Sequence, residues 1–379
     1  MALAHDQPRI LLITRNFPPL TGGMERLMQH VASGVSAYAQ LTIVGPRGCT
    51  QHCPAGSTVY ESSSRLLPFL FFSIWHAAKA CRNTKFQIMI GGSGLVAPAL
   101  LVLARIFGGR TVVFLHGLDI VVESRVYQWL FLPCIRAMDH LIANSRNTMR
   151  LATGKGIEAS RLCVINPGTS LPDLDGIEPR GDFLRRKQVA FEKVMVFVGR
   201  ITRRKGLSQF IRHSLPLIHE MAPTAGLVVV GENPDQSLNK QGEAKVVTDL
   251  VAELGLGDRV VFLGQLSDME LLAGYAAADV QIFPLIDVPG DVEGFGMVAI
   301  EAAACGTPTV AFAAGGVADA ISEQNGILVE PGRYDLLAEA IVRSLQEGLP
   351  DRRQCVEHAR EFRWENYHEK IRAVLESLL

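Results

Sequence analysis

The chain has 379 residues, of which 48% are hydrophobic and 20% charged, and a formal net charge of −1 at pH 7. This length allows two domains of ordinary size, each with its own core. The balanced charge excludes both an overall basic field for nucleic acid and an acidic tail.

Cysteine usage and the start of the chain favour a cytoplasmic protein. The seven cysteines form no zinc-like set, because Cys49-x3-Cys53 has no second pair to complete a site. The first residues, MALAHDQPR, lack the apolar core of a signal peptide. No run reaches the ~20 apolar residues that span a bilayer. We therefore expect reduced thiols and a cytoplasmic location.

The first half of the chain alternates β-rich apolar runs with helical stretches, which indicates a doubly wound parallel sheet. Ligands of such sheets bind at the carboxyl ends of the strands, so the residues that follow each run matter most. The predicted strands are Ile10–Thr14, Leu41–Val44, Phe86–Ile90, Thr111–Leu115, His140–Ala143 and Leu162–Ile165.

Two glycine-rich loops follow predicted strands. Gly22 and Gly23 open a helix after the first strand, where paired glycines can wrap a phosphate, but a simple turn explains them equally well. After the third strand, the segment from Gly92 to Ala97 matches the dinucleotide fingerprint G-x-G-x-x-A. We interpret it as fortuitous, because it does not follow the first strand and no acidic residue ends a strand about twenty positions later.

The apolar run Leu66–Trp75 has two interpretations. Its flanking Arg and Lys residues fit a helix that lies on a membrane surface, which implies peripheral contact with the inner face of the plasma membrane. A core helix between two strands explains the same residues, and we favour it.

The fourth predicted strand ends in His116 and, three residues later, Asp119. A lone histidine at a strand end is more often structural than catalytic. Further on, Ser145 is expected to cap a helix. Residues 170–193 have a linker composition. Asp173-Leu-Asp175 mimics a metal-binding Asp-x-Asp motif, but its place in a linker indicates solvated charge, so we expect no metal.

The second half repeats the strand–helix rhythm. After its first strand, Arg200 leaves a strand end and Lys205 opens a helix, a poor arrangement for the helix dipole but a suitable one for a diphosphate. An ordinary basic surface loop is the alternative, and it fits Arg203 and Arg204. The predicted strands are Val194–Val198, Gly226–Val230, Arg259–Leu263, Val280–Phe283, Thr309–Phe312 and Gly326–Val329.

The segment Asp291–Pro308 reads as a loop that runs into a helix. Gly294 and Gly296 give a flexible approach, the helix formers from Met297 to Cys305 follow, and Gly306 and Pro308 end the helix. The free N–H groups near Phe295–Met297 can hold an anion such as a phosphate.

Two carboxylates, Glu293 and Glu301, accompany this predicted anion site. They would repel a phosphate unless they reach past it, so we predict that they accept hydrogen bonds from hydroxyl groups. Solvated positions are the ordinary alternative. Glu301 is the only charged residue between Gly294 and Ala318, and a carboxylate in so apolar a segment needs a partner.

The string EGFGMVAIEAAACGTPTVAFAAGG, followed by Asp319, resembles the hallmark of retaining nucleotide-sugar glycosyltransferases of the GT-B fold, family 4, such as phosphatidylinositol mannosyltransferases. The PPxxGG loop at Pro18–Gly23 and the GR-x4-KG motif at Gly199–Gly206 match the same family and occur in the same order along the chain. The resemblance implies an α/β protein with two Rossmann-like domains facing each other across a cleft. Residues 1–170 would bind the acceptor, completed by a C-terminal helix at 361–379 that Trp364 anchors, and residues 171–360 would bind the donor.

The resemblance also implies the roles of individual residues. Arg200 and Lys205 would neutralise the departing phosphate, while His116 and Glu293 contact the sugar and Glu301 the ribose. Val261 and Leu263 would carry the base through backbone groups. The implied catalytic residues are His116, Arg200, Lys205 and Glu293. The implied donor-binding residues are Gly22, Gly23, Arg200, Lys205, Val261, Leu263, Glu293, Gly294, Phe295, Gly296, Met297 and Glu301.

The expected reaction is therefore a retaining transfer of a hexose (mannose, glucose or a rhamnose-type sugar) from a GDP or UDP sugar, without cofactor or metal. The expected acceptor is a lipid-linked glycan of a cell-surface polysaccharide, lipopolysaccharide or glycolipid. The alternatives are a GT-B epimerase or phosphorylase and a non-catalytic nucleotide-sugar-binding subunit. An NAD oxidoreductase is a remote third class, because it rests only on the Gly92 fingerprint.

Overall fold

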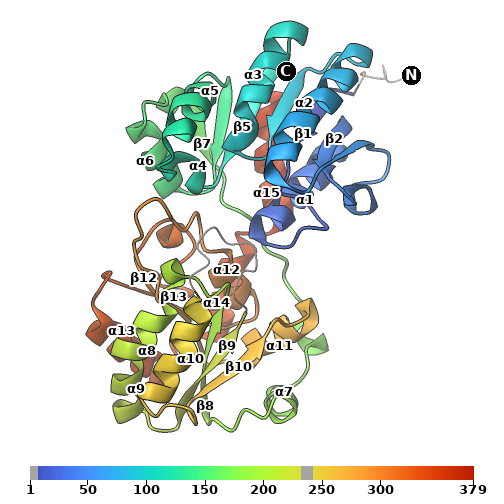
Figure 1. The fold of residues 1–379 in the computed structure, drawn as a ribbon. Helices are drawn as coiled ribbons and strands as arrows, with labels where there is room; N and C mark the ends of the chain where they lie inside the picture. Colours follow the sequence, from blue (N-terminus) through green and yellow to red (C-terminus); the bar gives the residue numbers. More distant parts are fainter. Residues whose placement is uncertain (1–6, 232–241) are drawn as a thin grey trace. The chain divides into compact units, whose positions relative to one another are not determined.

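The computed structural model describes residues 7–231 and 242–379 and divides into two compact units (Figure 1). Unit 1 comprises Met1–Gly168 and Trp364–Leu379, and unit 2 comprises Thr169–Arg363. The chain start on which the signal-peptide prediction rests, residues 1–6, lies outside the described residues.

Unit 1 is built on a parallel sheet with strand order β3-β2-β1-β4-β5-β6-β7 within the described residues. The edge strand β3 was not predicted. Its sequence, TVYES, contains only Val59 and Tyr60 as apolar or aromatic residues and is only partly buried, so it lacks the continuous apolar run that marks the inner strands. The strands are β1 Arg9–Ile13, β2 Gln40–Pro46, β3 Thr58–Ser62, β4 Ile88–Gly91, β5 Arg110–Leu115, β6 His140–Ala143 and β7 Leu162–Val164.

Helices cover both faces of this sheet. One core forms where α2, α3, α5 and α6 pack against the sheet, and α1 lies beside the C-terminal helix α15 behind the sheet in the view of Figure 1. The side chain of Ser145 accepts from the N–H of Thr148, so it caps α6 as predicted. The helices are α1 Gly23–Ser36, α2 Leu66–Asn83, α3 Ala97–Phe107, α4 Leu118–Val121, α5 Leu132–Arg136, α6 Arg146–Gly154 and α15 Trp364–Glu376, with short turns η1 Cys49–His52, η2 Gly94–Val96, η3 Tyr127–Phe131 and η4 Ala159–Arg161.

The favoured interpretation of Leu66–Trp75 as a core helix is wrong for most of its large side chains. Helix α2 buries a narrow, mainly small-residue face that includes Ser73 and Ala77, with Phe69 as its large anchor. Leu67, Phe71 and Trp75 are exposed. Within the described residues, no helix combines the length and the apolar character needed to cross a membrane.

Unit 2 contains a second parallel sheet, with order β10-β9-β8-β11-β12-β13 in the described part of the chain. Its central strands are almost completely buried, which is typical of a sheet covered by helices on both faces. The strands are β8 Lys193–Val198, β9 Ala225–Val230, β10 Val260–Gly264, β11 Val280–Phe283, β12 Thr309–Phe312 and β13 Gly326–Val329. The helices are α7 Arg180–Arg186, α8 Leu207–His213, α9 Leu215–Met221, α10 Glu243–Glu253, α11 Asp268–Ala277, α12 Met297–Ala304, α13 Tyr334–Glu347 and α14 Arg352–Arg360, with turns η5 Leu174–Gly176, η6 Arg203–Lys205 and η7 Val317–Asp319.

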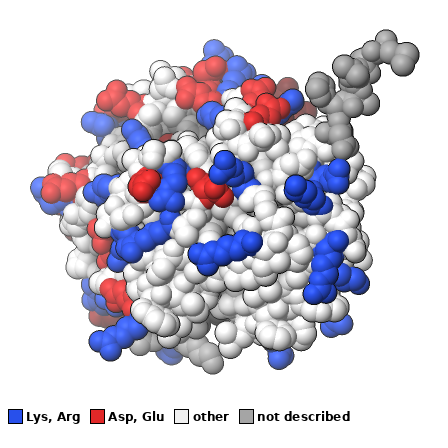
Figure 2. Space-filling view, turned by 90° about the horizontal axis from the view of Figure 1, so that it is seen from above, with Lys and Arg blue, Asp and Glu red and all other residues white. Residues whose placement is uncertain are grey.

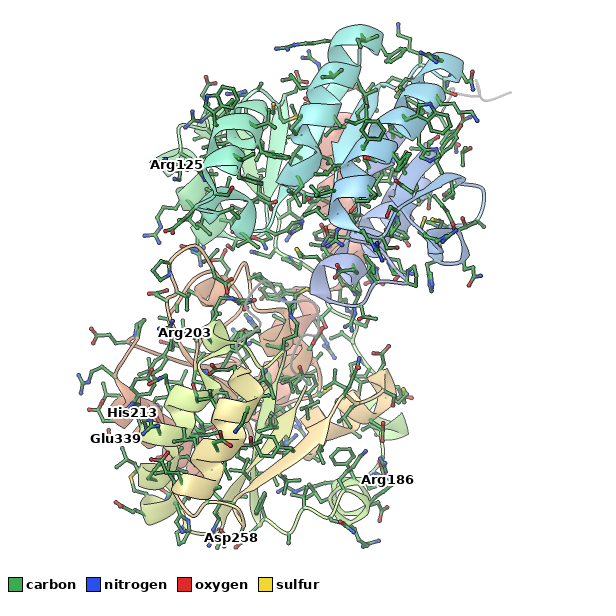
Figure 3. All side chains as sticks on the ribbon, in the orientation of Figure 1. Arg125, Arg186, Arg203, His213, Asp258 and Glu339 are labelled. Atoms are coloured by element: carbon green, nitrogen blue, oxygen red, sulfur yellow. The ribbon has the colours of Figure 1, made fainter. Side chains whose placement is uncertain are left out.

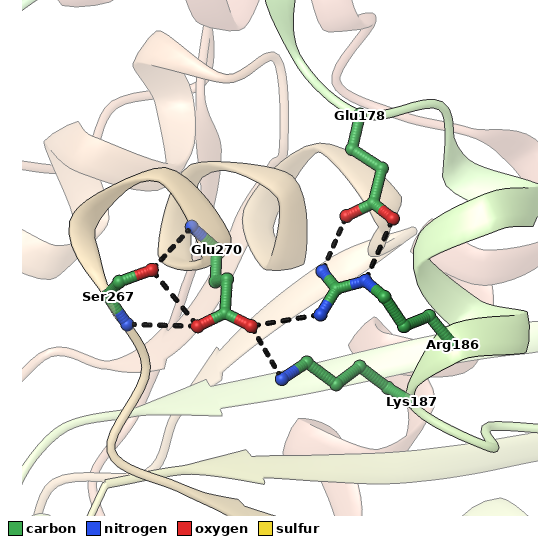
Figure 4. A network of polar contacts seen from close by, with 5 residues as sticks. All are labelled: Glu178, Arg186, Lys187, Ser267 and Glu270. Carbon is green, nitrogen blue, oxygen red and sulfur yellow. Dashed lines mark hydrogen bonds and ion pairs between the residues drawn. The ribbon is translucent and has the colours of Figure 1, made fainter.

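The predicted linker at residues 170–193 is in part a folded element. Helix α7 packs on α11 and buries Phe183. Figure 4 shows the ion-pair network between these two elements, in which Glu270 pairs with Arg186 at 3.0 Å and with Lys187 at 2.8 Å. Composition alone did not predict this helix, because its charged residues resemble those of a solvated linker but pair with residues of another element. Asp173 and Asp175, in contrast, are exposed.

The helix predicted within residues 361–379 is α15, and residues 361–363 separate it from α14. Trp364 begins α15 and stacks on His30 of α1, with ring centroids 3.6 Å apart and planes 5° apart. A Cβ atom at Gly168 would lie 2.5 Å from the Trp364 ring, so the chain can pass there only as glycine. These contacts give Trp364 a packing role within unit 1.

Candidate functional site

Both sheets reverse their strand order at one point. In unit 2 the reversal lies between β8 and β11, and in unit 1 between β1 and β4. In an open parallel sheet, the loops that leave the strands on either side of such a point form the ligand-binding crevice. The loops after β8 and β11 carry the residues 199–206 and 284–296, which include half of the predicted donor-binding residues.

Close backbone packing joins these two loops of unit 2. Gly206 has φ +69°, and a Cβ atom there would lie 1.8 Å from the carbonyl oxygen of Pro284, so only glycine fits. The N–H of Ile286 donates to the carbonyl of Arg204 at 3.0 Å. As a result, the buried Lys205 lies with its Nζ 4.6 Å from the centroid of the Phe283 ring.

A cluster of charges lies where the loops meet. Nζ of Lys205 donates to Oε2 of Glu293 at 2.8 Å, and Nη1 of Arg204 donates to the same oxygen. Nε of Arg204 also pairs with Oδ1 of Asp291 at 3.0 Å. Burial opposes ionisation of Glu293, but the charges of Lys205 and Arg204 outweigh it and lower the pKa of Glu293 to about 2. Glu293 is therefore an anion at neutral pH.

The interpretation of Arg204 as a solvated surface residue is wrong. Its side chain is only 12% exposed and bridges two carboxylates, whereas the neighbouring Arg203 is exposed, as predicted. Figure 3 labels Arg203 at the end of unit 2 where the strands finish, opposite Asp258 at the other end. Sequence reasoning missed Arg204 and Asp291 because their contact joins loops 87 positions apart. The acidic pair Asp291-x-Glu293 opposite a basic run was the available signal.

The main chain of Glu293 is also fixed. Its carbonyl accepts from the N–H of Gly316 at 2.9 Å. Gly315 has φ +59°, and a Cβ atom there would lie 2.7 Å from the same carbonyl. The glycine pair at the end of the family motif therefore lets the loop after β12 hold Glu293 in place.

Helix α12 begins at Met297, as predicted, after a left-handed Gly296 with φ +95°. Phe295 is buried, and Phe283 lies so close to Gly296 that a Cβ atom there would approach its ring to 2.9 Å. Gly294, Phe295 and Gly296 thus form the tight entry into the helix. Inside it, Oε2 of Glu301 accepts from the hydroxyl of Tyr275 at 3.4 Å, which supplies the partner that the apolar segment required.

The other predicted donor residues of unit 2 lie on the loop after β8 and on the edge strand β10. Arg200 is exposed on the loop after β8. Val261 and Leu263 lie on the edge strand β10, partly buried against the core that includes Phe183. Their side chains serve packing, which leaves their backbone groups as the ones a base could use.

In unit 1, His116 lies at the end of β5 and links it to the loop after β4. Its Nε2 donates to the carbonyl of Gly92 at 2.8 Å. Nδ1 is buried and has no hydrogen-bond partner among the described residues. The carboxylate of Asp119 accepts from the N–H groups of His116 at 2.9 Å and Gly94 at 3.0 Å. Asp119 therefore positions the loop that holds His116.

The glycines of the dinucleotide-like segment are explained by packing inside unit 1. A Cβ atom at Gly92 would lie 2.3 Å from the Thr14 hydroxyl oxygen, and one at Gly94 would lie 2.6 Å from Ile135. The other loop at this reversal carries Gly22, with φ +153°, followed by Gly23 as the first residue of α1. The carboxylate of Glu25 lies directly beside Gly22 and accepts from Asn16 at 3.0 Å.

No group of three or more His, Cys, Asp or Glu side chains that could hold a metal ion occurs in residues 7–231 and 242–379. All seven cysteines are free thiols.

Two family models match the chain. The model for glycosyl transferases group 1 matches residues 182–362, and the model for glycosyltransferase family 4 matches residues 21–171. The chain belongs to glycosyltransferase family 4. The group 1 match contains the whole charge cluster of unit 2, and the family 4 match contains His116.

Among curated proteins, this family 4 chain is similar to D-inositol 3-phosphate glycosyltransferases. It is 35% identical to the one from Mycobacteroides abscessus over 232 residues, which cover 60% of this chain and 49% of the relative. It is 34% identical to the one from Acidothermus cellulolyticus over 259 residues, or 65% of this chain and 54% of the relative. The chain thus spans about half the length of the curated relatives it matches.

Solved structures share the fold over nearly the whole chain. The Anabaena HepE protein in complex with UDP aligns with a TM-score of 0.77 at 21% identity, covering 97% of this chain and 100% of HepE. Sucrose-phosphate synthase from Thermosynechococcus elongatus also aligns with a TM-score of 0.77, at 25% identity, covering 98% of this chain and 99% of the synthase. The two Rossmann-like units therefore have the GT-B fold.

Proposed function

We propose that this protein is a retaining glycosyltransferase that moves a hexose from a nucleoside diphosphate sugar to an acceptor hydroxyl without a metal ion. The observation that carries the proposal is the Glu293 carboxylate, which is held by Lys205 and Arg204 beside the start of α12 at the strand reversal of unit 2. This arrangement brings two cations and free helix N–H groups to one place, as a diphosphate requires.

In the proposed reaction, the acceptor oxygen forms a bond to the anomeric carbon while the bond from that carbon to the phosphate oxygen breaks. The acceptor attacks from the face that the phosphate leaves, and its proton passes to the departing phosphate oxygen. Arg200, Lys205 and the N–H groups at Phe295–Met297 stabilise the negative charge that develops on this phosphate. Charge stabilisation by protein groups of this kind removes the need for a metal.

Glu293 and Glu301 accept hydrogen bonds from hydroxyl groups in this proposal, Glu293 from the sugar and Glu301 from the ribose. The resident ion pair also prepares Lys205 and Arg204 to exchange Glu293 for a phosphate, while Glu293 gains a sugar hydroxyl. In unit 1, Nδ1 of His116 accepts from a sugar hydroxyl, and Gly22 and Gly23 approach the donor through their backbone. The base contacts backbone groups at Val261 and Leu263.

For the acceptor, we propose a lipid-linked glycan of cell-surface polysaccharide or glycolipid assembly on the cytoplasmic face of the membrane. The exposed apolar side of α2 in unit 1 supports a lipid-borne acceptor. A soluble phospho-polyol is the second candidate, because the chain is 31–35% identical to D-inositol 3-phosphate glycosyltransferases.

The direct test is a transfer assay with UDP and GDP hexoses, in which D-inositol 3-phosphate and a polyprenyl-diphosphate-linked sugar are the acceptors and NMR reads the anomeric configuration of the product. We expect an α-linked product from an α-linked donor. Arg200→Ala and Glu293→Ala should each lose at least ~2 kcal/mol of transition-state stabilisation, about 30-fold in kcat/KM. An inverted product, or unchanged kcat/KM in both variants, contradicts the proposal.

The same assay separates the alternatives. Interconversion of the donor sugar without any acceptor identifies an epimerase, and use of inorganic phosphate identifies a phosphorylase. Donor binding without turnover of any acceptor or of water favours a non-catalytic subunit.

A further inference from the structure

The outward side of α2 is an apolar surface made of large side chains. Leu67 is 76% exposed, Phe71 is 72% exposed and Trp75 is more than half exposed. These residues recur at intervals of four along the helix, so they share one face. Phe72 and Ile74 extend it. A helix that packs on its sheet mainly through small residues and presents its largest ones to solvent is the reverse of an ordinary surface helix.

The neighbouring elements continue this surface. Helix α3 packs beside α2, and η3 packs beside α3. Ile106 on α3, Val126 just before η3 and Trp129 within it are each more than half exposed, and Trp129 reaches 83%. We refer to the exposed apolar residues of α2, α3 and η3 as the apolar face. Because it extends over adjacent elements of one layer, it exceeds the isolated hydrophobic residues of an ordinary protein surface.

The segment that carries α2 and α3 has charges of one sign. Residues 62–118 contain six Lys or Arg residues and no Asp or Glu, although the whole chain has a net charge of −1. All six cations are exposed. Figure 2, which views the molecule from above, shows a broad uncharged area at its lower right with Lys and Arg side chains set in it, while Asp and Glu side chains lie over the upper and left parts of the view and near its centre. The six cations are Arg65, Lys79, Arg82, Lys85, Arg105 and Arg110.

We propose that the apolar face docks unit 1 on the surface of an anionic lipid bilayer. Aromatic side chains enter the headgroup and upper acyl region, and the surrounding cations contact the lipid phosphates. This combination of exposed aromatic residues with the six exposed cations of residues 62–118 matches a membrane interface. No helix among the described residues is long and apolar enough to span the bilayer. The inference rests on the proposed function for its purpose, delivery of a lipid-linked acceptor, but docking can be measured without any reaction.

The tryptophans provide a built-in probe. Trp75 and Trp129 lie on the apolar face, and the third tryptophan, Trp364, is buried elsewhere in unit 1. Brominated lipids quench tryptophans that enter the acyl region. With phosphatidylglycerol-containing vesicles we expect a blue shift and quenching, which the double variant Trp75→Phe/Trp129→Phe loses while it still sediments with the vesicles. Pure phosphatidylcholine vesicles should give much weaker binding.

Surface variants test which residues drive docking. Phe71→Ser/Trp129→Ser should lower partitioning at least about tenfold, and Lys79→Glu or Arg82→Glu about fivefold or more each. The matched controls in unit 2, Met269→Ser and Arg343→Glu, also change exposed residues and should leave partitioning unchanged. Circular dichroism checks that each variant is folded.

Three results would overturn the proposal. The first is equal binding to neutral and anionic vesicles, and the second is quenching that persists without Trp75 and Trp129. The third is a dimer in analytical ultracentrifugation that Phe71→Ser/Trp129→Ser dissociates, because a second copy would then be the occupant. Vesicle binding by a protein with no transfer activity would retain the docking inference and reject the proposed function. Transfer activity in a protein that binds no vesicles would retain the proposed function and reject the docking inference.

Discussion

Units 1 and 2 both place polar groups at the point where their strand order reverses, but they hold these groups by different contacts. In unit 2 the loops are joined by side-chain charges, with Glu293 between Lys205 and Arg204. In unit 1 the loops are joined through the backbone, since His116 donates to the Gly92 carbonyl and Asp119 accepts from main-chain N–H groups.

The difference shows which contacts a ligand can replace. A charged ligand can exchange with an ion pair, because a phosphate offers Lys205 and Arg204 a second anion and a hydroxyl offers Glu293 a donor. The backbone contacts of unit 1 leave one ring nitrogen, Nδ1 of His116, for a ligand. We therefore expect charge and binding energy to come mainly from unit 2, and unit 1 to contribute orientation.

Lys205→Ala should have the largest effect, because it removes one partner of a buried pair and leaves Glu293 with Arg204 alone. Loss of one partner of a buried ion pair costs about 3–5 kcal/mol. Hydrogen exchange on the strands of unit 2 should show this loss of protection, and kcat/KM should fall as well. The double variant Lys205→Met/Glu293→Gln should lose less stability than the sum of the two single variants. Strict additivity would mean that the pair does not couple the loops.

Acid should weaken unit 2 through the same carboxylate. The folded-state pKa of Glu293 is lowered from 4.5 to about 2, so its ion pairs contribute fully above pH 4.5, and this contribution is lost as the pH falls towards 2. The shift corresponds to about 3 kcal/mol. Between pH 5 and pH 2 the unfolding free energy of Glu293→Gln should fall less steeply than that of the wild type, by about 1.4 kcal/mol per pH unit at most. Identical slopes would contradict the assignment.

Asp119→Ala tests the backbone-held loop of unit 1. It leaves the buried N–H groups of His116 and Gly94 without their acceptor, so we expect a loss of about 2–3 kcal/mol. Tryptophan fluorescence can measure it, because all three tryptophans lie in unit 1. Glu123→Ala, an exposed change on the same segment, should stay within about 0.5 kcal/mol of the wild type. If both variants unfold alike, Asp119 does not anchor the loop.

Arg204→Ala against Arg203→Ala is the smallest and most closely matched comparison. Arg204 bridges Asp291 and Glu293, so its loss should cost about 1.5 kcal/mol, roughly tenfold in kcat/KM. Arg203 is exposed, and its variant should remain within about twofold of the wild type. Steady-state kinetics with the preferred donor decides it. Equal losses of kcat/KM in the two variants would mean that Arg204 acts as an ordinary surface residue, as the sequence suggested.

The sequence predicted the inner strands and the start of α12 because buried parallel strands and glycine-bounded helices leave local signals. It missed the edge strand β3, which is too polar to give a continuous apolar run, and α7, which packs on α11. Both failures concern elements that a neighbouring element stabilises more than their own composition does.

For the site, the sequence indicated Lys205 and Glu293 as functional residues but did not predict that they pair with each other. It also assigned Arg204 to solvent, because a basic loop residue has no local sign of a carboxylate 89 positions away. The outward side of α2 was misjudged for a related reason, since periodicity identifies the faces of a helix but not which face the sheet covers.

The most direct test of the central claim, that the charge cluster of unit 2 binds a nucleoside diphosphate, is a thermal-shift panel with UDP, GDP, ADP and NAD, with and without chelator. At 100 times its Kd, a ligand stabilises the folded protein by about 2.7 kcal/mol. We predict that one nucleoside diphosphate raises the Tm, that chelator changes nothing, and that Arg200→Ala weakens the shift. A shift with NAD alone would contradict the account and point to the Gly92 segment of unit 1 instead.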